Sequence, residues 1–170
     1  MPFERLKEKA EKVISPVRDF VERTRQQLLL LEEMEAETTP SPQSNSFLRN
    51  GETFVVKYVP YQELAPLFGC AIQWGNINHA HIRNDLPEDI QRFVKSHELF
   101  HLIDDSEWGG WVGRELRANL IPGLKDPVGL WKTIKATVQD KERRELYMGK
   151  IRMAISGVLA DEESSVFRGF

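Results

Sequence analysis

Two histidines and a glutamate in the segment SHELFHLIDD, residues 96–105, form the pattern H-E-x-x-H. A helix has about 3.6 residues per turn, so His97 and His101 lie about 40° apart on one helix face, one turn above the other. Two imidazoles placed in this way can bind one metal ion. Glu98 lies beside His97, where its carboxylate can reach a metal-bound water without being a ligand. The pattern is typical of zinc hydrolases, in which the metal lowers the pKa of the water and the carboxylate accepts its proton.

A catalytic zinc ion usually has three protein ligands, so a third ligand is expected besides the two histidines. Asp104 lies on the same helix face as His97, but one straight helix cannot easily supply three corners of a tetrahedron. Glu107 follows in a predicted loop. Glu115 lies on the next predicted helix, beyond a glycine-rich turn, and can approach the metal from a second direction. We expect Glu115 as the third ligand, with Asp104 or Asp105 as the alternatives; otherwise these two aspartates orient a histidine or cap the loop.

The composition indicates one globular domain with an appendage, because 170 residues with 41% hydrophobic and 29% charged residues can bury one sizeable core. The net charge of -3 and the lack of a basic stripe argue against nucleic acid as a partner. Cys70 is the only cysteine, which excludes an intramolecular disulfide and suits a reducing compartment. The sequence shows neither an apolar signal core at its start nor an apolar run of membrane-spanning length. We expect a soluble cytoplasmic protein that binds neither membranes nor nucleic acid.

A long amphipathic helix is predicted over residues 1–37, because apolar side chains from Phe3 to Met34 recur almost strictly every three or four residues. Pro16 interrupts the pattern and can begin a second helix after Ser15. So narrow an apolar seam covers either the core of the domain itself or a partner helix, and self-association through it stays open. The rest of the chain divides into a Pro- and Ser-rich linker, a domain and a mobile tail, at residues 38–46, 47–160 and 161–170.

The remaining periodicity predicts a small sheet followed by helices, which is the pattern of an α+β domain. Three strands are expected from runs of β-branched and aromatic residues, at residues 52–59, 70–74 and 77–83. Helices are expected at residues 61–68, 86–103, 114–121, 128–139 and 141–160. Pro122 and Gly123 should end the helix that carries Glu115, and residues 108–111 should form a loop. Asn84 or Asp85 is the expected cap of the histidine helix.

The run INHAHIRNDLPEDIQRFVKSHELFHLIDD followed by RELRANLIP, within residues 77–122, resembles the catalytic core of the ImmA/IrrE-like zinc metallopeptidases, and more broadly of the small gluzincins. In that family a strand and a polar turn lead to a helix with an Arg-Phe pair before H-E-x-x-H, and then to a glutamate helix reading E-x-x-A-N. The resemblance implies a zincin-like minimal metallopeptidase fold and one bound Zn²⁺, and it places Asn119 beside the ligands as an outer residue or alternative ligand. The matching positions are Arg92, Phe93, His97, Glu98, His101, Glu115, Ala118 and Asn119.

The predicted strand 77–83 is the best candidate for an exposed sheet edge, along which a peptide substrate can add as a further strand. Its alternation puts His79 and His81 on one face and Ala80 and Ile82 on the other. If the apolar pair faces the core, the two histidines rim the cleft and are candidate oxyanion donors. Three tyrosines are the alternative donors, namely Tyr58, Tyr61 and Tyr147.

These features favour a zinc-dependent metalloendopeptidase that is latent or of narrow specificity, in which Glu98 takes a proton from water and passes it to the leaving amine. The alternative is a catalytically weak or inactive relative that keeps the metal for structure and acts as a regulatory protein-binding module through its N-terminal helix. A regulator of toxin–antitoxin or phage type with a single protein target is a third hypothesis. A purely structural histidine pair is the competing interpretation of the motif, and its apolar, helix-compatible surroundings argue against it.

Overall fold

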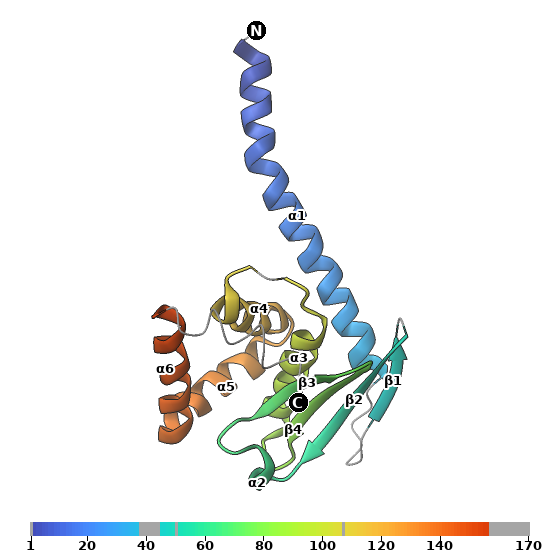
Figure 1. Cartoon of the computed structure of the whole chain (residues 1–170), viewed down its shortest axis with the longest axis vertical. Helices are drawn as coiled ribbons and strands as arrows, with labels where there is room; N and C mark the ends of the chain where they lie inside the picture. Colours follow the sequence, from blue (N-terminus) through green and yellow to red (C-terminus); the bar gives the residue numbers. More distant parts are fainter. Residues whose placement is uncertain (1, 38–44, 50, 107, 157–170) are drawn as a thin grey trace.

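Strand-forming and helix-forming stretches follow one another as the sequence predicts, and the α+β fold class is confirmed. The structure is a computed structural model that describes residues 2–37, 45–49, 51–106 and 108–156. Within these residues there are six helices and a four-stranded mixed sheet (Figure 1). In chain order the elements are α1 (Pro2–Glu37), β1 (Asn45–Arg49), β2 (Glu52–Val59), α2 (Tyr61–Leu64), β3 (Gly69–Trp74), β4 (Ile77–Arg83), α3 (Glu88–Ile103), α4 (Gly110–Lys125), α5 (Pro127–Gln139) and α6 (Lys141–Ile155).

The sheet has the strand order β1-β2-β4-β3, so β4 lies in its interior and β3 at its edge. β2 and β4 are parallel, and the other neighbouring pairs are antiparallel. The prediction that residues 77–83 form the exposed edge was therefore wrong. The turn at Gly75, which has a φ of 58°, folds β4 back beside β3. This hairpin then joins β2 through β4, so that within the described part of the chain one side of β3 has no neighbouring strand.

β1 is a strand that the sequence analysis missed, because Asn45 and Ser46 fall in the stretch interpreted as a linker. β1 pairs antiparallel with β2, and the Phe47 ring stacks on the Phe54 ring with the centroids 5.2 Å apart. A neighbouring strand and this aromatic pair stabilise a segment with little strand propensity of its own. The rest of the predicted linker, residues 38–44, and the predicted tail lie outside the described residues.

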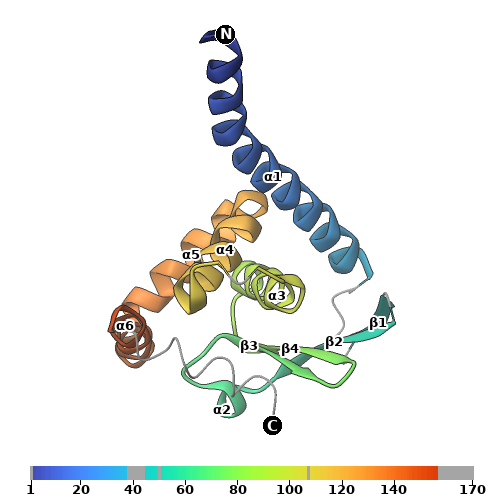
Figure 2. The ribbon, with the colours of Figure 1, turned by 45° about the horizontal axis from the view of Figure 1, so that its top comes forward.

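The apolar core lies between the sheet and α3. Ala80 and Ile82 of β4 and Val56 of β2 are fully buried in one cluster with Leu99 and Phe100 of α3. Figure 2 shows α3 over one face of the sheet, with α4 and α5 beyond it. Because α3 is central, its surface away from the sheet is close to α4 and α5, and this position lets neighbouring helices complete a site on the histidine motif.

The C-terminal end of α1 packs on the domain, whereas toward its N-terminus the helix extends away from it (Figure 1). Leu31 and Met34 are fully buried in the domain core. Glu35 accepts hydrogen bonds from Ser96 of α3 and Lys125 of α4. The last turns of α1 are therefore part of the same packing unit as the sheet and α3.

None of the described helices, α1 included, has the length and apolar character needed to cross a membrane.

Leu31→Ala tests this packing and is expected to lower the free energy of unfolding by about 2–5 kcal/mol, the usual cost of a large-to-small change in a core. Leu31 is 0% exposed, so the substitution leaves a cavity between α1 and the domain. Leu29→Ala on the same helix is the matched control, because Leu29 is 51% exposed. Urea unfolding measures both variants. Equal, small effects would show that α1 is not part of the cooperative unit.

Helix boundaries differ from the prediction where prolines and glycines were interpreted as breaks. α1 is continuous through Pro16, and α4 begins at Gly110, inside the predicted loop, and continues through Pro122. A proline removes one helical hydrogen bond, and at Pro122, whose side chain is fully buried, the packing around α4 can offset that loss. α2 has only 4 residues and is shorter than predicted. The residue at the N-cap of α3 is Pro87, which makes no side-chain cap hydrogen bond, so the predicted cap at Asn84 or Asp85 was wrong.

Candidate metal centre

Two neighbouring helices bring the three predicted metal ligands together. His97 and His101 lie one turn apart on α3, and Glu115 lies on α4. The two histidine Nε2 atoms are 3.1 Å apart. Glu115 Oε1 is 3.5 Å from His101 Nε2, and Glu115 Oε2 is 3.8 Å from His97 Nε2. One ligand atom from each side chain lies within 4.8 Å of the other two, so this half-buried cluster could hold a metal ion.

A buried ion pair holds the loop that joins α3 to α4. The Asp104 carboxylate is 0% exposed and accepts a hydrogen bond of 2.9 Å from Arg117 Nε. Arg117 also donates to the backbone carbonyls of Ser106 and Trp108. Asp104 therefore fixes the loop and, through Arg117, the position of α4. Asp105 is exposed, and neither aspartate belongs to the cluster of ligand atoms found in the described part of the chain.

The outer ring nitrogen of His97 is fixed by α4. Nδ1 lies 3.0 Å from the backbone oxygen of Ala118, and because a carbonyl only accepts, Nδ1 carries the proton in this contact. Nε2 then has its lone pair available for the cluster. Burial, together with the neighbouring His101, lowers the pKa of His97 to about 4, so His97 is neutral at pH 7. Burial alone would raise the pKa of Glu115, but the hydrogen bond from His101 and the two nearby imidazoles outweigh it and lower that pKa.

Glu98 is the buried carboxyl next to the cluster. It is 7% exposed, and it lines a cavity together with His97. Burial raises the pKa of Glu98 well above its usual range, and the nearby Glu115 carboxylate raises it further, whereas Lys150 of α6 acts in the opposite direction. The cluster of possible ligands found among the described residues does not include Glu98. A carboxyl with a raised pKa beside possible metal ligands has the properties of a general base.

The raised pKa of Glu98 should make the stability of the metal-free protein depend on pH. Above the unfolded-state pKa of about 4.3 the folded state binds more protons than the unfolded state, so the free energy of unfolding falls as the pH rises toward 8. Glu98→Gln cannot titrate and removes the contribution of this residue to the pH dependence. At pH 8 we expect its free energy of unfolding to be about 1–3 kcal/mol higher than that of the wild type. Urea unfolding in a chelator at several pH values measures the effect. Glu145→Gln is the control, because this carboxylate is 66% exposed, and its stability should depend on pH as that of the wild type does. If the stability of Glu98→Gln shows the same pH dependence as these two proteins, the prediction is wrong.

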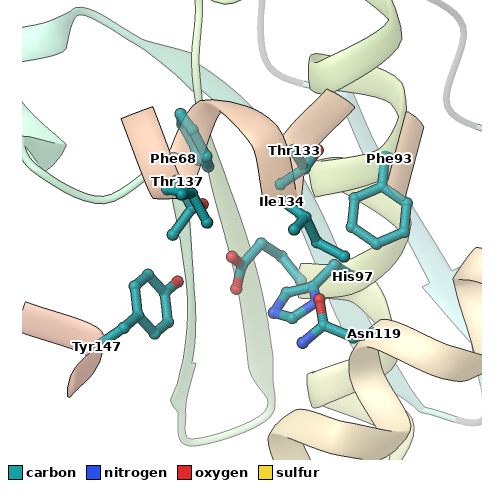
Figure 3. Close-up of a pocket in the computed structure, with 11 residues that line it drawn as sticks. Phe68, Phe93, His97, Asn119, Thr133, Ile134, Thr137 and Tyr147 are labelled. Carbon is teal, nitrogen blue, oxygen red and sulfur yellow. The ribbon is translucent and has the colours of Figure 1, made fainter. Parts of the chain in front are cut away.

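The cavity beside His97 and Glu98 has a volume of about 240 Å³. Tyr147 of α6, one of the predicted oxyanion donors, points its hydroxyl into this cavity across from His97 and Asn119 (Figure 3). Burial raises the pKa of Tyr147, so the hydroxyl keeps its proton at neutral pH and can donate a hydrogen bond. The apolar part of the wall comes from α3, α5 and the segment before β3, through Phe93, Ile134, Val138 and Phe68.

Comparisons with known proteins assign no family to this arrangement. No protein-family model, curated protein or solved structure matches the chain.

The structure does not bring His79 and His81 to the cavity, so the prediction that they rim the cleft was wrong. The predicted alternation is present, because Ala80 and Ile82 are buried in the cluster with α3. The cavity lies on that same side of the sheet, whereas the two histidines face the other side, with their ring centroids 5.8 Å apart. The other two candidate tyrosines do not line the cavity either.

Asn119 lies in the cavity wall, on the same helix as the predicted ligand Glu115. Its Nδ2 donates to the backbone oxygen of Glu115 at 2.7 Å, so the side chain is bonded to its own helix. The assignment of Asn119 as an outer residue or alternative ligand stays a prediction. Glu107, the remaining candidate ligand, lies outside the residues that the structure describes.

Arg143 holds α6 against the cavity and was missed by the sequence analysis. The residue is 4% exposed, its Nε donates to the Pro66 carbonyl at 2.6 Å, and its guanidinium lies 3.6 Å from the centroid of the Phe68 ring. Asp140 caps α6 and pairs with Arg143. These contacts place Tyr147, one turn further along α6, in the cavity wall. Arg143 and Pro66 are 77 positions apart, and a local sequence pattern cannot predict a contact over that separation.

Gly69, at the start of the edge strand β3, leaves room for the Glu98 side chain. A Cβ at this position would lie 2.8 Å from Glu98 Oε1 and 2.8 Å from Val94 Cγ1, closer than real contacts allow. The helix predicted for residues 61–68 would end directly before Gly69, and its pattern predicts no further role for this glycine. In the structure the absent side chain is what permits Glu98 to pack against the edge of the sheet.

Proposed function

We propose that the protein is a zinc-dependent peptide hydrolase with a zincin-like domain, related to the ImmA/IrrE-like metallopeptidases. The observation that carries this proposal is a His-His-Glu ligand set beside a separate buried carboxyl, Glu98, in the wall of one cavity. Two imidazoles and one carboxylate are a ligand set of catalytic zinc sites, which keep one position open. The resemblance of residues 77–122 to that family points in the same direction.

The residues of the chain supply three functions in this proposal. Zinc bound to His97, His101 and Glu115 would polarise a peptide carbonyl and lower the pKa of a water molecule. Glu98 accepts a proton from the attacking water and delivers it to the leaving amine, and its raised pKa favours the delivery. Tyr147 donates a hydrogen bond from its hydroxyl to the carbonyl oxygen as negative charge develops there, since the hydroxyl points into the cavity.

The free edge of β3 is the proposed place for the substrate backbone. Among the described strands β3 pairs with β4 alone, and its first residue, Gly69, lies against Glu98. A peptide that adds to this edge as a further strand passes directly by the carboxyl. Phe68, Phe93 and Ile134 give the adjoining cavity apolar walls that can accept an apolar side chain of that peptide.

Zinc content and metal-dependent cleavage test the proposal. Mass spectrometry of the native protein should show about one zinc ion per chain, as in a three-ligand catalytic site. A pool of synthetic peptides is then incubated with the protein, with the protein and a chelator, and with chelated protein to which zinc is returned. Cleavage that stops with the chelator and returns with zinc supports the proposal. A protein that binds no zinc overturns it.

Gly69→Ala is expected to displace the Glu98 carboxylate without touching the metal ligands. A displacement near 1 Å can reduce the rate of hydrolysis about 100-fold, while the zinc content should stay unchanged. The crowding also costs about 1–3 kcal/mol of stability. Gly149→Ala on α6 is the matched control, because a Cβ there meets no atom of the described residues within 4 Å. Hydrolysis rates and zinc content of both variants are compared, and a Gly69→Ala rate equal to that of the control would contradict the proposed role of Gly69.

A second candidate function, a regulatory protein-binding module, is favoured by the shape of α1. The helix extends away from the domain, and Phe20 and Val21 are 59% and 58% exposed (Figure 1). If the helix self-associates, sedimentation of the full chain gives a mass above that of one chain, and a Phe20→Ser, Val21→Ser double variant lowers it. Zinc binding without any peptide cleavage, together with such association, would favour this function over hydrolysis.

A further inference from the structure

Pro122 lies inside α4 with its side chain fully buried. Proline has no backbone N–H, and its ring crowds the carbonyl four residues earlier in the helix. In α4 that carbonyl belongs to Ala118, which therefore lacks its usual helical donor. The helix resumes directly afterwards, since Asp126 N donates to Pro122 O at 2.9 Å.

The Ala118 carbonyl needs another donor, because buried backbone carbonyls are almost always paired. Ala118 is 0% exposed, so water is not a ready substitute. The donor is His97, whose Nδ1 lies 3.0 Å from the Ala118 oxygen. The carbonyl released by the proline is thus the one to which a candidate metal ligand bonds.

This contact decides which nitrogen of His97 is available. With the proton on Nδ1, Nε2 keeps its lone pair, and Nε2 is the atom that lies 3.1 Å from His101 Nε2 and 3.8 Å from Glu115 Oε2. A hydrogen bond to the outer nitrogen of a metal-binding histidine fixes both the tautomer and the direction of the ring. We propose that Pro122 is a positioning residue of the metal centre, which frees the Ala118 carbonyl to hold His97 with Nε2 toward the cluster. The metal part of this inference rests on the proposed function, whereas the tautomer is a property of the metal-free chain.

The wild-type tautomer is the first test. Long-range ¹H–¹⁵N spectra of the metal-free protein, with ¹⁵N-labelled histidine, distinguish a protonated ring nitrogen from an unprotonated one, and a His97→Gln variant assigns the signals. We expect His97 to be protonated on Nδ1. Protonation on Nε2 in the wild type overturns the inference, and this measurement does not depend on any variant of Pro122.

Pro122→Ala is the second test, because alanine restores an N–H that competes with His97 for the Ala118 carbonyl. We expect a smaller fraction of the Nδ1-protonated tautomer and a zinc affinity that is about 10–100-fold weaker, measured by competition with a chelator. The urea midpoint of the metal-free variant should not fall, because alanine is the better helix former. A purely structural role would move stability and zinc affinity downward together, so opposite directions identify positioning.

Pro127→Ala is the matched control. Pro127 is the first residue of α5, where an N–H has no partner within the helix, so this change should leave the His97 tautomer and the zinc affinity as in the wild type. If Pro122→Ala also keeps both, the inference is overturned. If the wild type binds no zinc, the proposed function fails, and the tautomer comparison between wild type and Pro122→Ala still decides the role of Pro122.

Discussion

Glu115→Gln is expected to weaken zinc binding by at least about 100-fold, because groups that only orient a ligand are already worth about 10–100-fold. Glu115 is the one anionic side chain of the cluster and the one contributed by α4. Its two oxygens lie 3.5 Å and 3.8 Å from the Nε2 atoms of His101 and His97, so the neutral amide would replace one ligand oxygen with a nitrogen that has no lone pair to offer. Zinc content after dialysis, and competition with a chelator, measure the change.

Two control variants separate loss of a ligand from loss of the fold. Asp105→Asn changes an exposed aspartate at the end of α3 and should retain zinc as the wild type does. Glu145→Gln removes an exposed carboxylate from α6 and should do the same. If Asp105→Asn loses the metal and Glu115→Gln retains it, the assignment of the third ligand is wrong. Circular dichroism of the metal-free variants checks that the helices are intact.

Glu98→Gln is expected to retain zinc and to reduce peptide hydrolysis by about 10²–10⁴-fold, the usual contribution of a general base. Glutamine has almost the same shape, but its amide cannot take a proton from water. The environment of Glu98 makes the two roles separable, because its carboxyl is buried in the cavity wall and, among the described residues, lies outside the ligand cluster. Zinc content and the rate of cleavage are measured on the same preparation.

The possible results for Glu98→Gln discriminate between the proposals. Loss of both zinc and hydrolysis would mean that Glu98 is itself a ligand. A hydrolysis rate equal to that of the wild type would exclude Glu98 as the base. Tyr147→Phe is the companion variant, since it removes only the hydroxyl that points into the cavity (Figure 3). We expect it to lower the rate by about 10²–10³-fold, as the loss of one oxyanion donor does, without a change in zinc content.

Local patterns were enough to predict the parts of the site that lie on one or two helices. His97 and His101 share a helix face because the helical repeat is set by the backbone alone. Glu115 could be selected because a glycine-rich turn lets the following helix fold back, and Gly109 has the positive φ of 81° that such a turn uses. The amphipathic seam of α1 likewise placed Leu31 and Met34 on the side that is buried.

Long-range pairing decided the features that were wrongly predicted. The alternation in β4 was correct, yet the cavity lies on the side of Ala80 and Ile82 and not on the side of His79 and His81. A strand pattern shows which residues share a face, but not which strand becomes the edge or which face the site adjoins. The contact between Arg143 and Phe68 could not be predicted from a local pattern either, because it forms only when α6 packs against the segment before β3.

The sequence by itself determined which side chains of α3 meet at the candidate metal centre, because the positions of the histidines and their neighbouring glutamate depend on helix geometry alone. Only the tertiary structure decided how these side chains are oriented. Pro122 looked like the end of a helix, since its missing N–H has a fixed local cost. In the folded chain α3 lies against α4, and His97 donates to the carbonyl that the proline leaves without a partner. Whether a carbonyl without its helical donor marks the end of a helix or accepts a hydrogen bond from a neighbouring histidine depends on what packs beside it.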